Sequence, residues 1–225
     1  MTQQGDTASK FEAYLGEAEA ARARYGVPGV GIAILQEGVE YTAGLGVTNI
    51  HHPLRVDADT IFQIGSTTKT FTATLIMMLA EEGKIDLDAP VRTYLPDLKL
   101  ADESAAANVT VRHLLIHHGG WIGDFFEDTG RGDDALKKYV EQMVTLRQEN
   151  PLDTVFAYNN AAFNLAGLLV SEVTGEVYED VLMKRLVQPL GMETTRIFPE
   201  DAIVHRTVSG HNTPVDGAPS IAEPW

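Results

Sequence analysis

The first repeating hydrophobic pattern in the chain has the period of a helix. Apolar side chains return every three or four positions between residues 8 and 25, and Gly26 and Pro28 follow them. This spacing predicts an amphipathic helix that Thr7 or Ser9 caps and that the glycine and the proline end.

Two short apolar runs come next, both rich in β-branched residues and glycine. Residues 29–35 and 39–47 flank Glu37-Gly38, which is a turn signal, so together they predict a β-hairpin. Two strands alone are not stable in water, and no later segment has a strong strand pattern. The hairpin therefore needs either helices that cover it or strands that lie beyond Trp225.

The rest of the chain has a mostly helical pattern. The run 66–82 is apolar on nearly all sides, which is typical of a buried helix, and Gly83 follows it. Further helices are predicted over residues 110–117, 134–148, 160–174 and 176–188. Helices segregated from strands indicate an α+β fold. We divide it into a helix and hairpin (1–65), a mostly helical region (66–200) and an irregular connection (201–225).

Composition is that of an ordinary globular protein, and it limits the partners. Of the 225 residues, 44% are hydrophobic and 22% are charged, and the formal net charge is −15. This charge repels phosphate backbones and anionic lipids, so neither nucleic acid nor a membrane is expected as a partner. The absence of cysteine excludes disulfides. The start lacks the basic and apolar regions of a signal peptide, which predicts a cytoplasmic location.

The tetrad Ser66-Thr67-Thr68-Lys69 is the first motif that carries chemistry. Residues three apart share a helix face, so the Lys69 amine can reach the Ser66 hydroxyl. Serine needs a neighbour to take its proton, and both burial and the positive end of a helix favour a neutral amine. Such a tetrad arises by chance about once in a chain of this length. Its position, after a loop and Gly65 and at the start of an apolar helix, favours a catalytic role.

A second motif, Tyr158-Asn159-Asn160, precedes the helix predicted for 160–174. A phenol close to a lysine cation ionises more easily and can relay a proton between nucleophile and leaving group. The Asn160 amide can hydrogen-bond both the lysine and a substrate amide. Taken alone, the motif is better explained by a packed tyrosine and an asparagine that caps the helix.

Together these motifs resemble the serine β-lactamase-related superfamily, which includes class C β-lactamases and penicillin-binding proteins. The matching segments are residues 61–69, 83–91, 109–117, 156–167 and 190–192. The resemblance implies that superfamily's fold and an acyl-enzyme formed on a lactam, ester or peptide carbonyl. Ser66 would be the nucleophile, and its backbone N–H would supply half of the oxyanion hole. Lys69 and Tyr158 would share the acid–base work, and Asn160 would position the substrate.

The chain departs from the pattern of that superfamily in one respect. A third motif, Lys-Thr-Gly or His-x-Gly, normally lies on a C-terminal strand and lines the opposite wall of the site. Here His117-His118-Gly119 and His118-Gly119-Gly120 match it, but they fall between the other two motifs. We therefore expect a C-terminal segment of the same protein, missing or present as a separate chain, to complete the sheet and supply the third motif.

Other features give weaker signals. The pairs His51-His52 and His117-His118 could suggest a metal, but adjacent residues point apart and no further ligand spacing completes a site. Neither a metal nor a cofactor is therefore expected. Trp121, which Phe125 and Phe126 follow in the same loop, either binds substrate or forms a small core.

Two functions remain open from the sequence. The first is a serine hydrolase, either a β-lactamase-like esterase or an intracellular amidase or peptidase that acts on a small ester, lactam or peptide. The missing export signal disfavours a resistance β-lactamase, which works outside the cytoplasm. The alternative is a non-catalytic penicillin-recognising or scaffold protein with the same fold, which the missing third motif supports.

Overall fold

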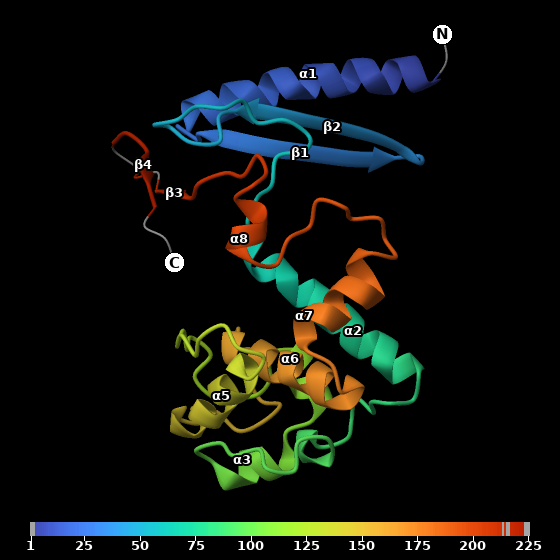
Figure 1. Cartoon of the computed structure of the whole chain (residues 1–225), viewed down its shortest axis with the longest axis vertical. Coiled ribbons are helices and arrows are strands. Elements are labelled where there is room, and N and C mark those ends of the chain that lie inside the picture. The colour runs from blue at the N-terminus through green and yellow to red at the C-terminus, as the bar shows by residue number, and fades with distance from the viewer. Residues whose placement is uncertain (1–2, 213, 215–216, 223–225) are drawn as a thin grey trace. The chain divides into compact units, whose positions relative to one another are not determined.

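The computed structural model describes residues 3–212, 214 and 217–222 and divides the chain into two compact units (Figure 1). Met1–Gln63 and Thr194–Trp225 are assigned to the first unit, and Ile64–Glu193 form the second. The helices are α1 (Gln3–Arg24), α2 (Thr68–Glu81), α3 (Glu103–Asn108), α4 (Val111–Leu115), α5 (Ala135–Gln142), α6 (Asn160–Thr174), α7 (Tyr178–Leu182) and α8 (Pro199–Ala202). The strands are β1 (Gly29–Gln36), β2 (Val39–Gly46), β3 (His211–Asn212) and β4 (Ser220–Ile221). The predicted α+β class is confirmed.

The first unit contains the predicted hairpin. β1 and β2 pair antiparallel over all 8 residues of each strand. Between them, Glu37 and Gly38 have φ values of 51° and 78°, the left-handed values that a two-residue type I′ turn requires. α1 packs against β2 (Figure 1), where the rings of Phe11 and Tyr41 lie 5.4 Å apart. The helix contacts the hairpin through β2, whereas most residues of β1 are exposed, so the predicted complete covering by helices is not found among the described residues.

Residues from both ends of the chain meet in the first unit. Ile61 forms a parallel bridge with Thr207, and Arg206 forms an ion pair with Asp57. β3 and β4 pair with each other and not with the hairpin. Within the described residues, the sheet of β1 and β2 therefore has two strands.

The first helix begins earlier than predicted. The sequence predicted residues 8–25 with Thr7 or Ser9 as a cap, whereas α1 runs from Gln3 to Arg24 and contains both residues. The prediction of the cap was wrong because Ser and Thr, although they favour caps, are also tolerated inside a helix at a small cost in helix propensity.

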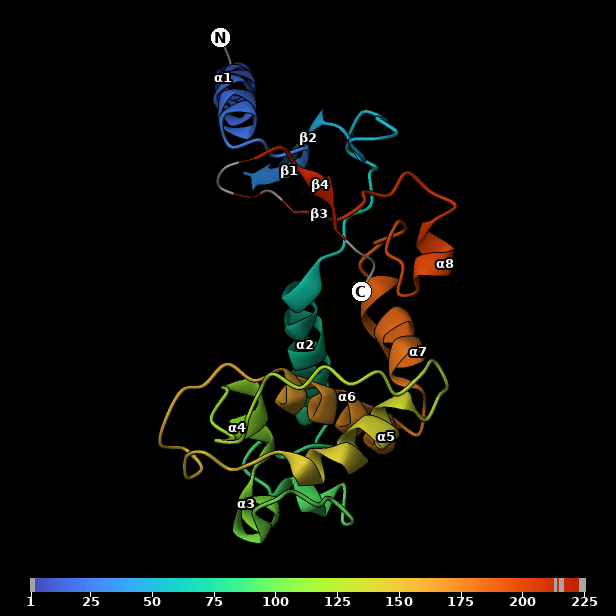
Figure 2. The same ribbon diagram turned by 90° about the vertical axis from the view of Figure 1, so that its left-hand side faces the viewer.

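The second unit gathers its helices around α6. This helix contacts α2, α4, α5 and α7 and lies among them (Figure 2). Its bounds agree with the predicted 160–174, and it ends at Gly175, whose φ of 71° is the left-handed value common after a helix. Its buried residues are Ala161, Ala162, Leu165, Ala166, Gly167, Leu168, Leu169 and Val170. No helix in the described part of the chain is long and apolar enough to cross a membrane.

Three other helices are shorter than predicted. α4 starts after Thr110, whose hydroxyl accepts from the N–H of His113 and caps the helix as predicted. It ends at Leu115 instead of His117, because His117 has a φ of 60°, which no α-helix allows. The run predicted over 134–148 is helical only over α5 and the 3-10 turn that follows it, and the run 176–188 divides into α7 and a π-helical turn.

The predicted helix 66–82 is confirmed in position but not in burial. A 3-10 turn over Gly65–Thr67 leads into α2, whose buried side chains are Thr72, Leu75, Ile76 and Leu79. Met77 is 46% exposed, so the prediction that this helix is buried on nearly all sides was wrong. α2 presents one face to α6 and carries the first motif at its start.

Candidate active site

The nucleophile candidate and its lysine meet at the start of α2. Ser66 lies in the 3-10 turn before the helix and is exposed, and Lys69 lies in the first turn of α2 and is partly buried. Lys69 Nζ donates a hydrogen bond to Ser66 Oγ at 3.2 Å. The spacing of three residues therefore produces the contact that the sequence predicted.

The Tyr-x-Asn motif reaches the same lysine from a distant part of the chain. Lys69 Nζ donates to Asn160 Oδ1 at 2.7 Å and lies 4.8 Å from the centre of the Tyr158 ring. Both residues sit where the 151–159 loop enters α6, so the packing of α6 against α2 brings the motifs together. One amine thus joins the hydroxyl of Ser66, the amide of Asn160 and the ring of Tyr158.

The phenol of Tyr158 is electrostatically tuned by its neighbours. Hydrogen bonding to Lys69 and then to Ser66 lowers the pKa of Tyr158 from its ordinary value of 10.0, and the charge of Lys69 lowers it further. Slight burial and the carboxylate of Asp124 raise the pKa, but they are outweighed. The site therefore favours the phenolate more than water does.

Asn159, and not Asn160, caps α6. Asn159 Oδ1 accepts from the N–H of Ala162 at 2.8 Å, and its Nδ2 donates to the carbonyl of Trp121 at 2.9 Å. Its side chain is fully buried. The alternative in which Asn160 only caps the helix was therefore wrong, and the Asn160 side chain is free to bind Lys69.

Asp124 is a member of the site that the sequence did not reveal. Its Oδ1 accepts from Asn160 Nδ2 at 3.1 Å. Because a carboxylate only accepts, this bond turns the amide so that Asn160 Oδ1 faces Lys69. The loop is held in place by the carbonyl of Gly123, which accepts from the N–H groups of Asn160 and Ala161 at 3.1 and 3.2 Å.

Aromatic side chains pack against the ring of Tyr158. The ring of His117 lies 4.6 Å from that of Tyr158 and 5.2 Å from that of Phe163. His117 Nδ1 accepts from the N–H of Asn159 at 3.0 Å, and burial, followed by the charge of Lys69, lowers the pKa of His117. The His-x-Gly match thus begins with a residue that packs against Tyr158.

The two adjacent histidines have different partners, since the ring of His118 pairs with Asp153 at 2.9 Å. The sequence gave His117 only as part of a His-x-Gly match and did not suggest Phe163. The packing of the turn after α4 against α6, which carries Phe163, brings the two rings together beside Tyr158.

Trp121 is not where a substrate-binding residue is expected. Its side chain is only 2% exposed, and its backbone bridges Gln148. Of the two roles that the sequence left open for the 121–126 loop, the structure places Trp121 in the core. Phe125 and Phe126 instead line a pocket.

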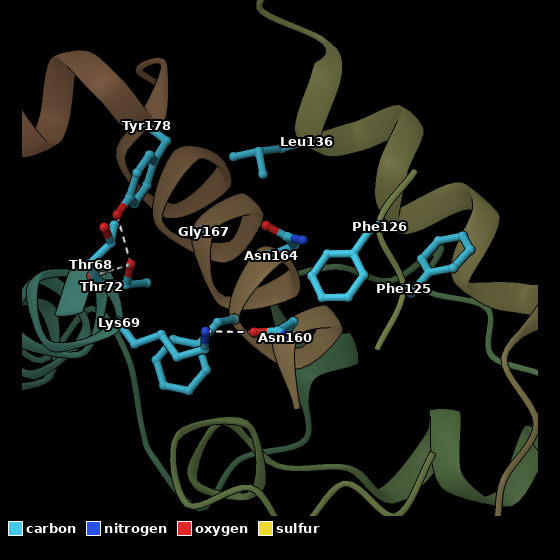
Figure 3. Close-up of a pocket in the computed structure, with 11 residues that line it drawn as sticks. Thr68, Lys69, Thr72, Phe125, Phe126, Leu136, Asn160, Asn164, Gly167 and Tyr178 are labelled. Atoms are coloured by element: carbon cyan, nitrogen blue, oxygen red, sulfur yellow. Dashed lines mark hydrogen bonds between the residues drawn. The ribbon is translucent and has the colours of Figure 1, made fainter. Parts of the chain in front are cut away.

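That pocket, of about 280 Å³, adjoins the catalytic candidates (Figure 3). Lys69 and Asn160 border it, and their hydrogen bond marks one side. Leu136 and Tyr178 lie toward the far side, and Phe125 and Phe126 form another wall (Figure 3). The arrangement places a serine hydroxyl, a lysine amine and a phenol beside a largely apolar recess, which are the groups that a nucleophile and its proton-transfer partners require.

Several known proteins are similar to this chain. A family model described as Beta-lactamase matches residues 11–225. Penicillin-binding protein 4 of Amycolatopsis lactamdurans is 36% identical over 207 residues, which are 92% of this chain and 54% of that protein.

Two solved structures are also similar. The octameric penicillin-binding protein homologue from Pyrococcus abyssi is 28% identical with a TM-score of 0.77, over 95% of this chain and 50% of that one. The D-amino acid amidase from Ochrobactrum anthropi is 28% identical with a TM-score of 0.70, over 86% of this chain and 55% of that one. The chain thus spans about half the length of each of these three relatives.

Proposed function

Because the chain belongs to the Beta-lactamase family, which includes serine hydrolases such as β-lactamases and amidases, we propose that it carries the nucleophile of an acyl-enzyme hydrolase. The substrate class is an ester, amide or lactam carbonyl. One observation supports this most directly: Lys69 Nζ contacts Ser66 Oγ and the ring of Tyr158 at once. A serine is activated in this way when a neighbouring base takes its proton.

In the proposed acylation step, Ser66 Oγ attacks the carbonyl carbon while its proton passes to the Lys69 amine or the Tyr158 phenolate. The backbone N–H of Ser66 donates to the oxyanion that forms. The bond to the leaving group then breaks, and Tyr158 delivers the proton to that group. The products of this step are an acyl-Ser66 ester and a neutral alcohol or amine, and in a lactam that amine stays attached to the acyl group.

Deacylation reverses the roles of the same groups. Water gives a proton to the same base and attacks the acyl-Ser66 carbonyl, and the proton returns to Ser66 Oγ as the acid leaves. Asn160 holds Lys69 in place throughout, and Asp124 fixes the orientation of the Asn160 amide. We propose that a further segment of the whole protein supplies the third motif and the second oxyanion donor.

A fluorophosphonate probe tests the proposal on the intact natural protein. We expect covalent labelling that is lost in Ser66→Ala, since only an activated serine reacts with the probe. Ser104→Ala, which changes an exposed serine on α3, is the matched control and should label like wild type. A folded natural protein that does not label would instead support the non-catalytic scaffold function.

The charge of Asp124 predicts a pH effect. This carboxylate raises the pKa of Tyr158, so Asp124→Asn should lower that pKa while the new amide can still accept from Asn160. If the phenolate is the base, it then persists to lower pH, and the acid limb of kcat/KM moves to lower pH. The measurement is a pH profile of kcat/KM.

Asp128→Asn is the matched control, because the Asp128 carboxylate accepts from the N–H of Gly130 in the same loop. Its profile should equal that of wild type. An acid limb that stays in place or moves to higher pH in Asp124→Asn would contradict the role of Tyr158 as the base.

A further inference from the structure

The pocket beside Lys69 leads away from the reacting groups. Lys69 and Asn160 border it, and neither Ser66 nor Tyr158 lines it. It extends between α2, α5, α6 and α7, with Leu136 and Tyr178 on the side away from the bond between Lys69 and Asn160 (Figure 3). A substituent that enters it therefore passes Asn160 on its way from the attacked carbonyl.

Apart from the exposed Thr68, the polar side chains that line the pocket already have partners in the protein. The hydroxyls of Thr72 and Tyr178 bond to each other at 2.7 Å. The Asn164 side chain bonds the hydroxyl of Tyr139, and the Asn160 amide is shared by Lys69 and Asp124. An apolar group can cover these atoms without leaving a donor or acceptor unpaired.

Apart from Thr68, the remaining lining is apolar and partly exposed. Its members are Phe125, Phe126, Leu136, Phe163, Gly167 and the ring of Tyr178. Phe126 is 79% exposed, so covering its ring removes apolar surface from water. The volume of about 280 Å³ lies just below the range of about 300–1,000 Å³ that is usual for small-molecule sites. It suits one substituent of a substrate better than a whole substrate.

We propose that this pocket binds a bulky apolar substituent on the acyl half of the substrate, such as an aromatic ring or a medium-length alkyl chain. The proposal rests on the proposed function, because it needs a carbonyl at Ser66. The leaving group departs beside Tyr158, which donates its proton. The half of the substrate that lies past Asn160, away from Tyr158, is therefore the half that stays on Ser66.

Gly167 lines the pocket from within α6. A glycine inside a helix costs about 1 kcal/mol relative to alanine, yet α6 has one at a buried position that lines the pocket. A Cβ on Gly167 would lie 3.4 Å from Leu136 Cδ1 and 3.7 Å from Tyr178 Cδ2. A methyl group would thus take up space in the pocket without a severe collision.

Gly167→Ala tests the proposal with p-nitrophenyl esters whose acyl groups are acetyl, octanoyl and phenylacetyl. The leaving group is constant, so differences in rate report on the acyl half. In the intact natural protein we expect kcat/KM to be higher for the octanoyl and phenylacetyl esters than for the acetyl ester. In Gly167→Ala the ratio of kcat/KM for the octanoyl ester to kcat/KM for the acetyl ester should fall roughly tenfold, the usual effect of one methylene in an apolar pocket.

Two further variants make the test specific. Gly16→Ala adds a methyl group to a helical glycine of α1, where no atom lies within 4 Å of the new Cβ, so the ratio should equal that of wild type. Leu136→Ala widens the pocket and should move the preference toward bulkier acyl groups. An unchanged ratio in Gly167→Ala, or rates in wild type that do not depend on the acyl group, would overturn the proposal.

Failure of the pocket and failure of the proposed function are distinguishable. If only the pocket proposal fails, the fluorophosphonate still labels Ser66, but the rates do not depend on the size of the acyl group. If the proposed function fails, the fluorophosphonate does not label Ser66 at all. A rate that depends on the length of the alcohol, and not of the acyl group, would assign the pocket to the leaving group and would also overturn the proposal.

Discussion

Replacing Lys69 with alanine is expected to lower kcat by at least about 10²-fold, the usual contribution of a positioned proton-transfer group. Its Nζ lies 3.2 Å from Ser66 Oγ and 2.7 Å from Asn160 Oδ1. Alanine removes the amine beside the nucleophile and the strongest influence that lowers the pKa of Tyr158. The pKa of the phenol therefore rises, and the acid limb of kcat/KM should move to higher pH. Steady-state kinetics over a pH range measure both effects.

A second substitution at the same position separates two roles of Lys69. Lys69→Arg keeps the positive charge and the donors, but a guanidinium does not lose its proton in a protein. If Lys69 is a base, the arginine variant is as slow as the alanine variant. If the lysine only supplies charge to Tyr158, the arginine variant recovers much of the lost kcat and the position of the acid limb.

The control for these variants is a lysine outside the site. Lys84 is exposed and pairs with Glu82 at 2.9 Å, a contact of the kind that contributes little at a surface. Lys84→Ala should therefore turn over substrate at the wild-type rate. Wild-type turnover in Lys69→Ala would remove this lysine from the mechanism.

The parts of the structure that the sequence predicted well are those that local chemistry determines. The hairpin follows from Gly38 in the turn, because a type I′ turn needs positive φ at both central residues and glycine adopts it without steric cost. The bounds of α6 follow from an asparagine that caps its start and from Gly175 after its end. The contact between Ser66 and Lys69 follows from their spacing on one turn.

The parts that were missed depend on contacts between distant segments. Asp124 belongs to the site because the carbonyl of Gly123 accepts from the first N–H groups of α6, and no periodic pattern records such a bond. His117 joins the site because the turn after α4 packs on α6 with a φ of 60°.

Of the two roles that the sequence left open for Trp121, substrate binding was wrong for a different reason. A glycine-rich aromatic loop has the composition of a binding loop, but here its indole turns inward and is only 2% exposed. Composition gives the character of a loop, whereas the direction of each side chain depends on what the loop packs against. The same loop does line the pocket, through Phe125 and Phe126.

Tyr158→Phe isolates the contribution of one hydroxyl, and we expect it to lower kcat/KM by about 10²-fold or more. The phenylalanine ring keeps its stacking on His117 and its place 4.8 Å from Lys69 Nζ. Because Tyr158 is 47% exposed, the free energy of unfolding should change by less than about 0.5 kcal/mol. Stopped-flow acylation measures the change in kcat/KM, and urea unfolding measures the change in the free energy of unfolding.

The pH profile decides what the hydroxyl of Tyr158 does. If its phenolate takes the proton of Ser66, the acid limb that depends on its lowered pKa disappears in Tyr158→Phe, and the remaining activity follows Lys69 alone. Tyr25→Phe, at a tyrosine that is 65% exposed in the first unit, controls for the loss of a phenol and should match wild type. A Tyr158→Phe protein that keeps the wild-type rate and the wild-type acid limb would leave proton transfer to Lys69, because the ring alone cannot carry a proton between nucleophile and leaving group.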